Sequence, residues 1–139
     1  MSERRYFAGT DQTIEIVLDA AATGGELGVM TLRLPPGAGS PPHRHNKESE
    51  TFVVREGELE VDLEGEAQTI MPGEAIFLPR GALHSFVSPA GALVAVLIVP
   101  AGLEEFFRAT CPTEPDGPLP DEGTVAAALE RHGLDFSGA

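Results

Sequence analysis

Hydrophobic and polar residues alternate along most of the first hundred residues, in short runs that glycine and proline interrupt. The clearest run spans residues 58–64, where Leu59, Val61 and Leu63 alternate with four acidic residues. Because successive side chains of a strand point to opposite faces, this run predicts a strand with an apolar inner face and an acidic outer face. The same pattern predicts strands at residues 13–18, 28–34, 50–55, 68–71, 75–78, 83–87 and 92–99. Short alternating strands separated by turn residues are typical of an antiparallel barrel or sandwich, so we predict an all-β fold.

The pattern changes after Pro100. Residues 103–108 predict a short helix, and residues 111–123, which include four prolines, predict an extended connection. Residues 124–132 predict a second helix, with Gly133 placed to end it. We therefore expect a β-barrel over residues 1–100 and a C-terminal extension over residues 101–139 with one or two short helices. We expect the helix of this extension to pack on the outer face of the barrel rather than cover its mouth.

Charge narrows the classes of partner. The 139 residues include 22 acids and 9 bases, which give a formal net charge of −13. Such a surface repels phosphate groups, so we expect neither nucleic acid nor a membrane as a partner. The single cysteine, Cys111, cannot form an internal disulfide, and no apolar run is long enough to cross a bilayer, so we expect a cytoplasmic protein. The acidic excess lies in residues 56–74 and 101–139, which indicates a role in solvation.

Three of the four histidines and one glutamate have spacings that suggest a metal site. His43 and His45 are two residues apart on an extended segment, so their side chains face the same way. Glu50 can join them only if residues 46–49 form a turn, which their polar side chains favour. His84 lies on a later strand. Three imidazoles and one carboxylate suit one divalent ion of Fe, Mn, Ni, Co, Cu or Zn and leave positions for water or substrate.

Burial in the core is the alternative interpretation of these residues. A buried, unpaired carboxylate at Glu50 would be costly, and a cation removes that cost, so we favour metal ligation. Phe52 and Val54 share the inward parity of Glu50, and Phe86 shares that of His84. These three apolar side chains are therefore candidates for a pocket wall as well as for the core.

Other polar residues have simpler interpretations. We expect Lys47 and Glu48 to be solvated turn residues. His132 lies at the end of the predicted tail helix, where it complements the helix dipole, so we do not expect it to be a ligand. Cys111 is interpreted as an ordinary thiol.

Two motifs resemble the signatures of the cupin superfamily. The first is Gly37-x5-His43-x-His45-x4-Glu50-x6-Gly57. The second is Gly73-x5-Pro79-x-Gly81-x2-His84, which in the family usually closes with an asparagine where this chain has Ser88. The resemblance covers roughly residues 13–100. It implies a cupin-type jelly-roll β-barrel with one metal ion inside its mouth, held by His43, His45, Glu50 and His84.

The chain also resembles the small, single-domain bacterial cupins related to quercetin dioxygenases. This likeness implies a mononuclear metal-dependent dioxygenase that acts on a small, apolar, enolisable or hydroxylated compound such as a flavonol. Glu50 would then be both a metal ligand and the general base that takes the hydroxyl proton. Two alternatives stay open: a non-catalytic metal- or ligand-binding module, and a metal-assisted isomerase or lyase. Because open jelly rolls leave strand edges to be covered, we also expect a homodimer.

Overall fold

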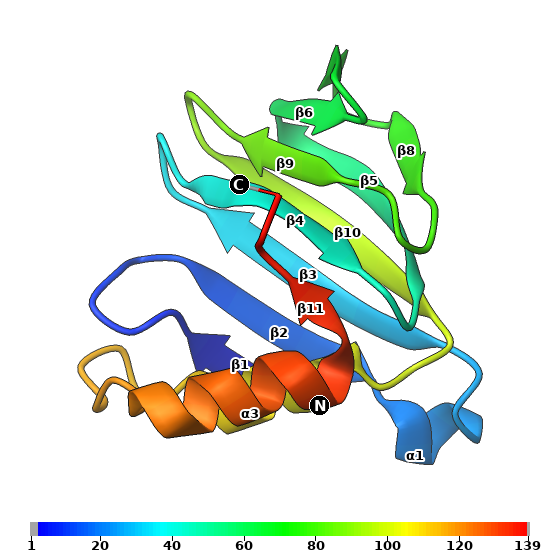
Figure 1. Ribbon diagram of the computed structural model, residues 1–139. Coiled ribbons are helices and arrows are strands. Elements are labelled where there is room, and N and C mark those ends of the chain that lie inside the picture. The colour runs from blue at the N-terminus through cyan, green and yellow to red at the C-terminus, as the bar shows by residue number, and fades with distance from the viewer. Residues whose placement is uncertain (1–2, 139) are drawn as a thin grey trace.

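The computed structural model describes residues 3–138, which form two antiparallel β-sheets and three helices (Figure 1). The larger sheet has six strands, in the order β1 (Glu3–Tyr6), β2 (Thr13–Leu18), β3 (Gly28–Leu34), β10 (Ala92–Val99), β5 (Ser49–Gly57) and β8 (Ala75–Leu78). The smaller sheet has five, in the order β11 (Leu134–Asp135), β4 (Gly39–His45), β9 (His84–Val87), β6 (Leu59–Leu63) and β7 (Glu66–Ile70). The all-β prediction is confirmed.

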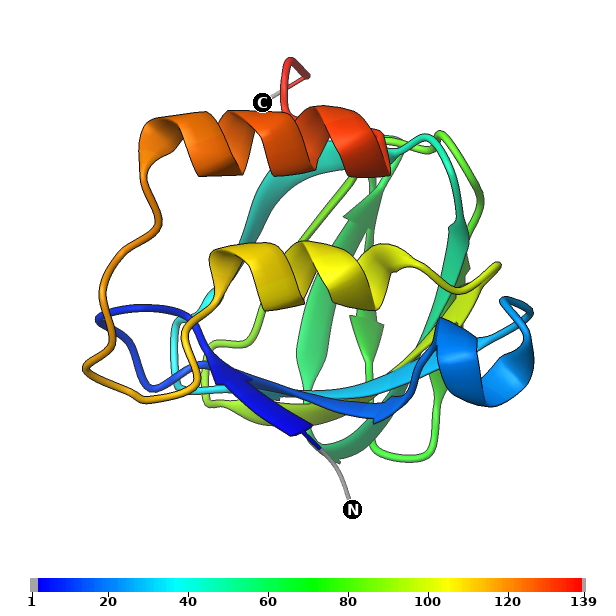
Figure 2. The same cartoon turned by 90° about the horizontal axis from the view of Figure 1, so that it is seen from below.

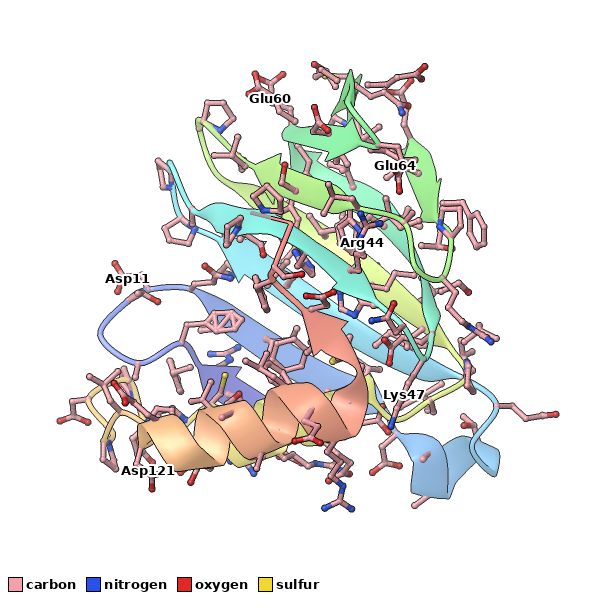
Figure 3. All side chains as sticks on the ribbon, in the orientation of Figure 1. Asp11, Arg44, Lys47, Glu60, Glu64 and Asp121 are labelled. Carbon is pink, nitrogen blue, oxygen red and sulfur yellow. The ribbon has the colours of Figure 1, made fainter. Side chains whose placement is uncertain are left out.

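The hydrophobic core follows from the alternation in the strands. Met30 on β3 and Val94 on β10 are fully buried, and so is Leu59 on β6 of the other sheet. Burying an aliphatic side chain of this size stabilises the fold by about 1.5–3 kcal/mol. The acidic residues between the inward positions of β6 face outward, and Glu60 points into solvent (Figure 3). The acidic cluster of residues 58–64 is therefore the outer surface of a strand, as predicted.

The helices are α1 (Ala20–Thr23), α2 (Leu103–Thr110) and α3 (Glu122–His132). The two predicted helices are confirmed as α2 and α3, each slightly longer than expected. Asp121 begins α3, because its carboxylate accepts a hydrogen bond from the Thr124 amide, and Gly133 ends it in the left-handed conformation. Figure 2 shows α2 across one end of the barrel with α3 beside it. None of the helices in the described residues is long and apolar enough to span a bilayer.

Two motif positions have structural roles. Gly57 has a φ of 73°, and a Cβ there would lie 2.0 Å from the carbonyl oxygen of Gly91, so this position accepts only glycine. Ser88 replaces the asparagine usual in the second motif. Its side chain is fully buried, and its Oγ donates a hydrogen bond to the Glu58 carbonyl oxygen at 2.7 Å. Ser88 therefore ties two loops together.

Some elements are absent from the sequence prediction. The strand β4 begins at Gly39 and runs through Pro41 and Pro42, which cannot donate ladder hydrogen bonds, and its register with β9 shifts between Ser40 and His43. The strands β1 and β11 and the helix α1 have only two to four residues, too few to show a period. The remaining differences are shifts of one or two residues at strand ends.

Candidate metal centre

The four residues predicted as metal ligands lie together between the two sheets. His43 and His45 are on β4 and His84 is on the adjacent strand β9, with His43 opposite His84 in the register. Residues 46–48 turn the chain from β4 into β5 of the other sheet, and this turn lets Glu50 face the three imidazoles. All four side chains are buried. The three histidines each offer one nitrogen, and these nitrogens lie within 4.8 Å of one another.

Hydrogen bonds behind the imidazoles orient all three rings. In each ring Nδ1 faces an oxygen that accepts a hydrogen bond, so in the neutral imidazole Nδ1 carries the proton and Nε2 has a free lone pair that can bind a metal. The acceptors are the Pro41 carbonyl oxygen at 2.8 Å for His43, Glu48 Oε2 at 3.1 Å for His45 and the Ala82 carbonyl oxygen at 3.2 Å for His84.

The Nε2 atoms meet the Glu50 carboxylate. His45 Nε2 lies 3.0 Å from His43 Nε2 and 2.9 Å from Glu50 Oε1, and His84 Nε2 lies 3.5 Å from the same oxygen. Among the described residues, Glu50 Oε1 and His84 Nε2 are buried side-chain atoms without a hydrogen-bond partner. Lone pairs that converge without donors repel one another unless a cation lies between them. The four residues therefore fit a divalent transition-metal ion for two reasons. Three imidazoles and a carboxylate are suitable ligands, and Glu50 Oε1 and His84 Nε2 have no other partner.

The close approach of these buried groups also shifts the pKa values of His43, His45 and Glu50. Burial lowers the pKa of His43 to about 4, so this ring is neutral. Burial also disfavours the charged form of His45, but the charge of the Glu50 carboxylate and the hydrogen bond that His45 donates to Glu48 outweigh burial and raise the pKa of His45 to about 9. Burial alone would raise the pKa of Glu50, yet the charge of His45 lowers it to about 2. A proton on His45 thus takes the place of a cation beside an ionised Glu50.

The prediction that Glu48 is a solvated turn residue is wrong. Its side chain is 4% exposed, because the turn after His45 directs it inward to accept the His45 Nδ1 hydrogen bond. Lys47 is exposed as predicted, but its Nζ donates a hydrogen bond to the Arg131 carbonyl oxygen at the end of α3. Glu48 is thus a functional candidate that the strand pattern missed.

An apolar cavity of about 330 Å³ opens next to the imidazoles. Phe52 and Phe86 line it, and their rings contact each other edge to face at 5.3 Å between centroids. Val54 is fully buried and belongs to the core instead, since it is not among the residues that line the cavity. The lining residues are Phe7, Gln12, Ile14, Met30, Leu32, Gly39, Ser40, His43, His45, Glu50, Phe52, Phe86, Val96, Leu103, Phe106, Phe107, Leu134 and Phe136.

The C-terminal extension supplies part of this cavity, which corrects the expected packing of the tail. Helix α3 packs against α2 and β11 rather than on the outer face of the barrel, because α2 lies across the end of the barrel with its apolar residues toward the cavity. Phe106 and Phe107 on α2 line the cavity, and so does Phe136 after β11. His132 is separate from the ligand cluster and lies 6.2 Å from Phe106 between ring centroids.

Comparison with known protein families settles the family. The model of the cupin domain matches residues 30–100, about half of the chain, and this segment contains all four residues of the cluster. The chain is a cupin. The jelly-roll fold expected from the two motifs is thereby confirmed, whereas the assignment of the four residues as metal ligands stays a prediction.

This cupin is similar to proteins with different activities. It is 32% identical to the quercetin 2,3-dioxygenase of Bacillus subtilis (strain 168) over 100 residues, which are 70% of this chain and 29% of that enzyme. It spans about half or less of the length of the curated enzyme and germin-like relatives that it matches. The structure of KdgF from Halomonas sp. superposes with a TM-score of 0.62 at 27% identity and covers 68% of this chain and 83% of that one. A cupin-superfamily sugar phosphate isomerase from Silicibacter pomeroyi gives 0.59 at 26% identity, with 70% and 71% covered.

Proposed function

We propose that this cupin holds one divalent transition-metal ion and is a dioxygenase for a small, apolar compound with an enolic or hydroxyl group. The observation that carries the proposal is the buried cluster of three imidazoles and Glu50 at the end of an aromatic cavity. His43, His45, His84 and Glu50 would be the ligands of Fe, Mn, Ni, Co, Cu or Zn. The likeness to quercetin 2,3-dioxygenase supports the reaction class.

In the proposed reaction the metal ion, Glu50 and the aromatic residues of the cavity have different roles. The ion, when bound, supplies Lewis-acid and redox chemistry at the inner end of the cavity. Glu50 would act as the general base, because its Oε1 lies among the imidazoles at the inner end of the cavity, where it would accept the proton of a substrate hydroxyl. The aromatic side chains around it, including Phe52 and Phe86, exclude water and hold the apolar body of the substrate.

The cavity also favours the oxygenase over the isomerase alternative. The residues that line it include no lysine, arginine or tyrosine, and its polar lining outside the cluster is Gln12 and Ser40. A sugar phosphate needs cationic or several polar partners, and an isomerase needs a second acid or base. The lining supplies neither, although the likeness to a sugar phosphate isomerase keeps that activity as an outcome of the test.

The experiment combines metal analysis with oxygen uptake. Protein purified without added metal should contain about one transition-metal ion per chain. His84→Ala should lose it, whereas His132→Ala, a matched histidine outside the cluster, should keep it. Protein reconstituted with each candidate metal should consume oxygen with flavonols under air and leave them unchanged without oxygen. Tight flavonol binding with no turnover would identify a non-catalytic module, and oxygen-independent conversion would identify an isomerase or lyase.

A further inference from the structure

We propose that Phe136 determines the substrate specificity of this cupin by presenting an aromatic wall to a planar aromatic substrate. Phe136 belongs to residues 133–138, here named the C-terminal strap, which closes the cavity next to His43. The substrate class rests on the proposed function, whereas the closing role of the strap does not.

The strap is anchored on the strand that carries two of the ligands. Leu134 pairs with His45 and Asp135 with Arg44, so the strap adds an edge strand to β4. The Asn46 amide also donates a hydrogen bond to the Gly133 carbonyl oxygen at 2.9 Å. These contacts fix the strap along the end of β4, from Arg44 to the first residue of the turn after His45.

Arg44 faces away from the cavity. Its Nη1 donates a hydrogen bond to the Gly81 carbonyl oxygen at 3.0 Å and lies 3.6 Å from Glu64 Oε1 (Figure 3). The outer surface of β4 is therefore polar, while its inner surface carries the imidazoles. Because Asp135 pairs with Arg44, the next residue of the strap, Phe136, reaches the inner side.

Phe136 stacks on His43. The ring centroids are 5.0 Å apart and the ring planes differ by 21°. The Phe136 side chain is nevertheless 38% exposed, so it is not a core residue that packing alone would select. One part of the ring contacts a candidate ligand and lines the cavity, and another part meets solvent, which places Phe136 at the boundary between the two.

The aromatic side chains that line the cavity favour an aromatic ligand. Aromatic rings attract one another in offset or edge-to-face contact at 4.5–7 Å between centroids. A planar substrate in the cavity finds such rings in Phe52, Phe86 and Phe136, and no lysine or arginine lines the cavity to favour an anionic group. The substrate class that fits is therefore a hydroxylated aromatic compound rather than an aliphatic enol.

Two measurements on metal-free protein test the proposal, so neither depends on the proposed reaction. The first is the rate at which diethyl pyrocarbonate modifies His43, located by mass spectrometry. We expect Phe136→Ala to raise this rate severalfold and Phe136→Leu, which keeps the wall, to leave it near that of the parent. Met71→Ala is the control, because Met71 is exposed between β7 and β8 and is not among the residues that line the cavity.

The second measurement is the Kd of 3-hydroxyflavone and of cyclohexane-1,3-dione, an aliphatic enol. Both Phe136 variants should weaken 3-hydroxyflavone binding by about three- to tenfold, the size of one aromatic contact, with little change for the dione. Equal His43 modification in parent and Phe136→Ala would overturn the closing role. Unchanged 3-hydroxyflavone affinity, or an equal loss for both compounds, would overturn the role in specificity. Absence of oxygen uptake would contradict only the proposed function.

Discussion

Replacing Glu48 by alanine tests whether the hydrogen bond behind His45 contributes to metal binding. The carboxylate is 3.1 Å from His45 Nδ1 and almost fully buried, so no water can readily replace it. Loss of a partner that orients a histidine ligand typically lowers metal affinity by about 10–100-fold, which corresponds to about 1.4–2.7 kcal/mol. We expect Glu48→Ala to weaken binding by this amount. Glu48→Gln should have a smaller effect, because its amide oxygen still accepts from Nδ1–H.

The assay is competition for Co²⁺ or Zn²⁺ between each variant and a chelator of known affinity. Circular dichroism and thermal unfolding of the metal-free proteins separate a loss of metal affinity from a loss of fold. Glu60→Ala removes the same charge from the exposed face of β6 and should bind metal like the parent. If Glu48→Ala also matches the parent, the hydrogen bond does not orient His45 for metal, and the role assigned to Glu48 is refuted.

Three further predictions concern stability and assembly. Glu104 is fully buried and accepts hydrogen bonds from the Ala20 and Gly102 amides, so Glu104→Ala should lower the free energy of unfolding in urea by about 2–3 kcal/mol. Hydrogen bonds from Arg108 lower the pKa values of Glu3 and Asp19 below their ordinary 4.5 and 3.8. These carboxylates therefore add stability above those values and lose it as the pH falls, and Arg108→Ala should flatten the pH dependence of unfolding between about pH 5 and 2. The homodimer stays a prediction, and Phe77, which is 58% exposed on β8, is a candidate contact. In light scattering the parent should be a dimer and Phe77→Glu a monomer. A monomeric parent would contradict the prediction.

The sequence predicted the positions of the candidate ligands well because their placement follows from the strand period. His43 and His45 share a face by their spacing of two, and the polar turn after His45 accounts for Glu50. The same reasoning placed Glu48 in solvent, because a polar residue in a loop is usually hydrated. No pattern in the neighbouring residues shows that the Glu48 carboxylate faces His45 Nδ1.

The wall formed by the C-terminal strap had no local signal. The strand β11 has two residues, so it leaves no alternation, and its pairing with β4 joins residues some ninety positions apart. Phe136 therefore looks like any aromatic residue near a chain end until the topology is known. The helices α2 and α3 were predictable from composition and capping residues. Where they pack was not, because it depends on which end of the barrel the strands leave open.

The ligand cluster and the strap come from separate stretches of the chain, and this separation has a consequence for how such proteins diversify. The stretch from His43 to His84 contains the four candidate metal ligands, whereas Phe106, Phe107 and Phe136 line the cavity from beyond residue 100. Substitutions in the later stretch can therefore change the lining of the cavity without replacing any of the four candidate metal ligands. On the proposed function, a chimaera that carries residues 101–139 of a related cupin on this barrel should keep the four candidate ligands and shift its ligand preference towards that of the donor.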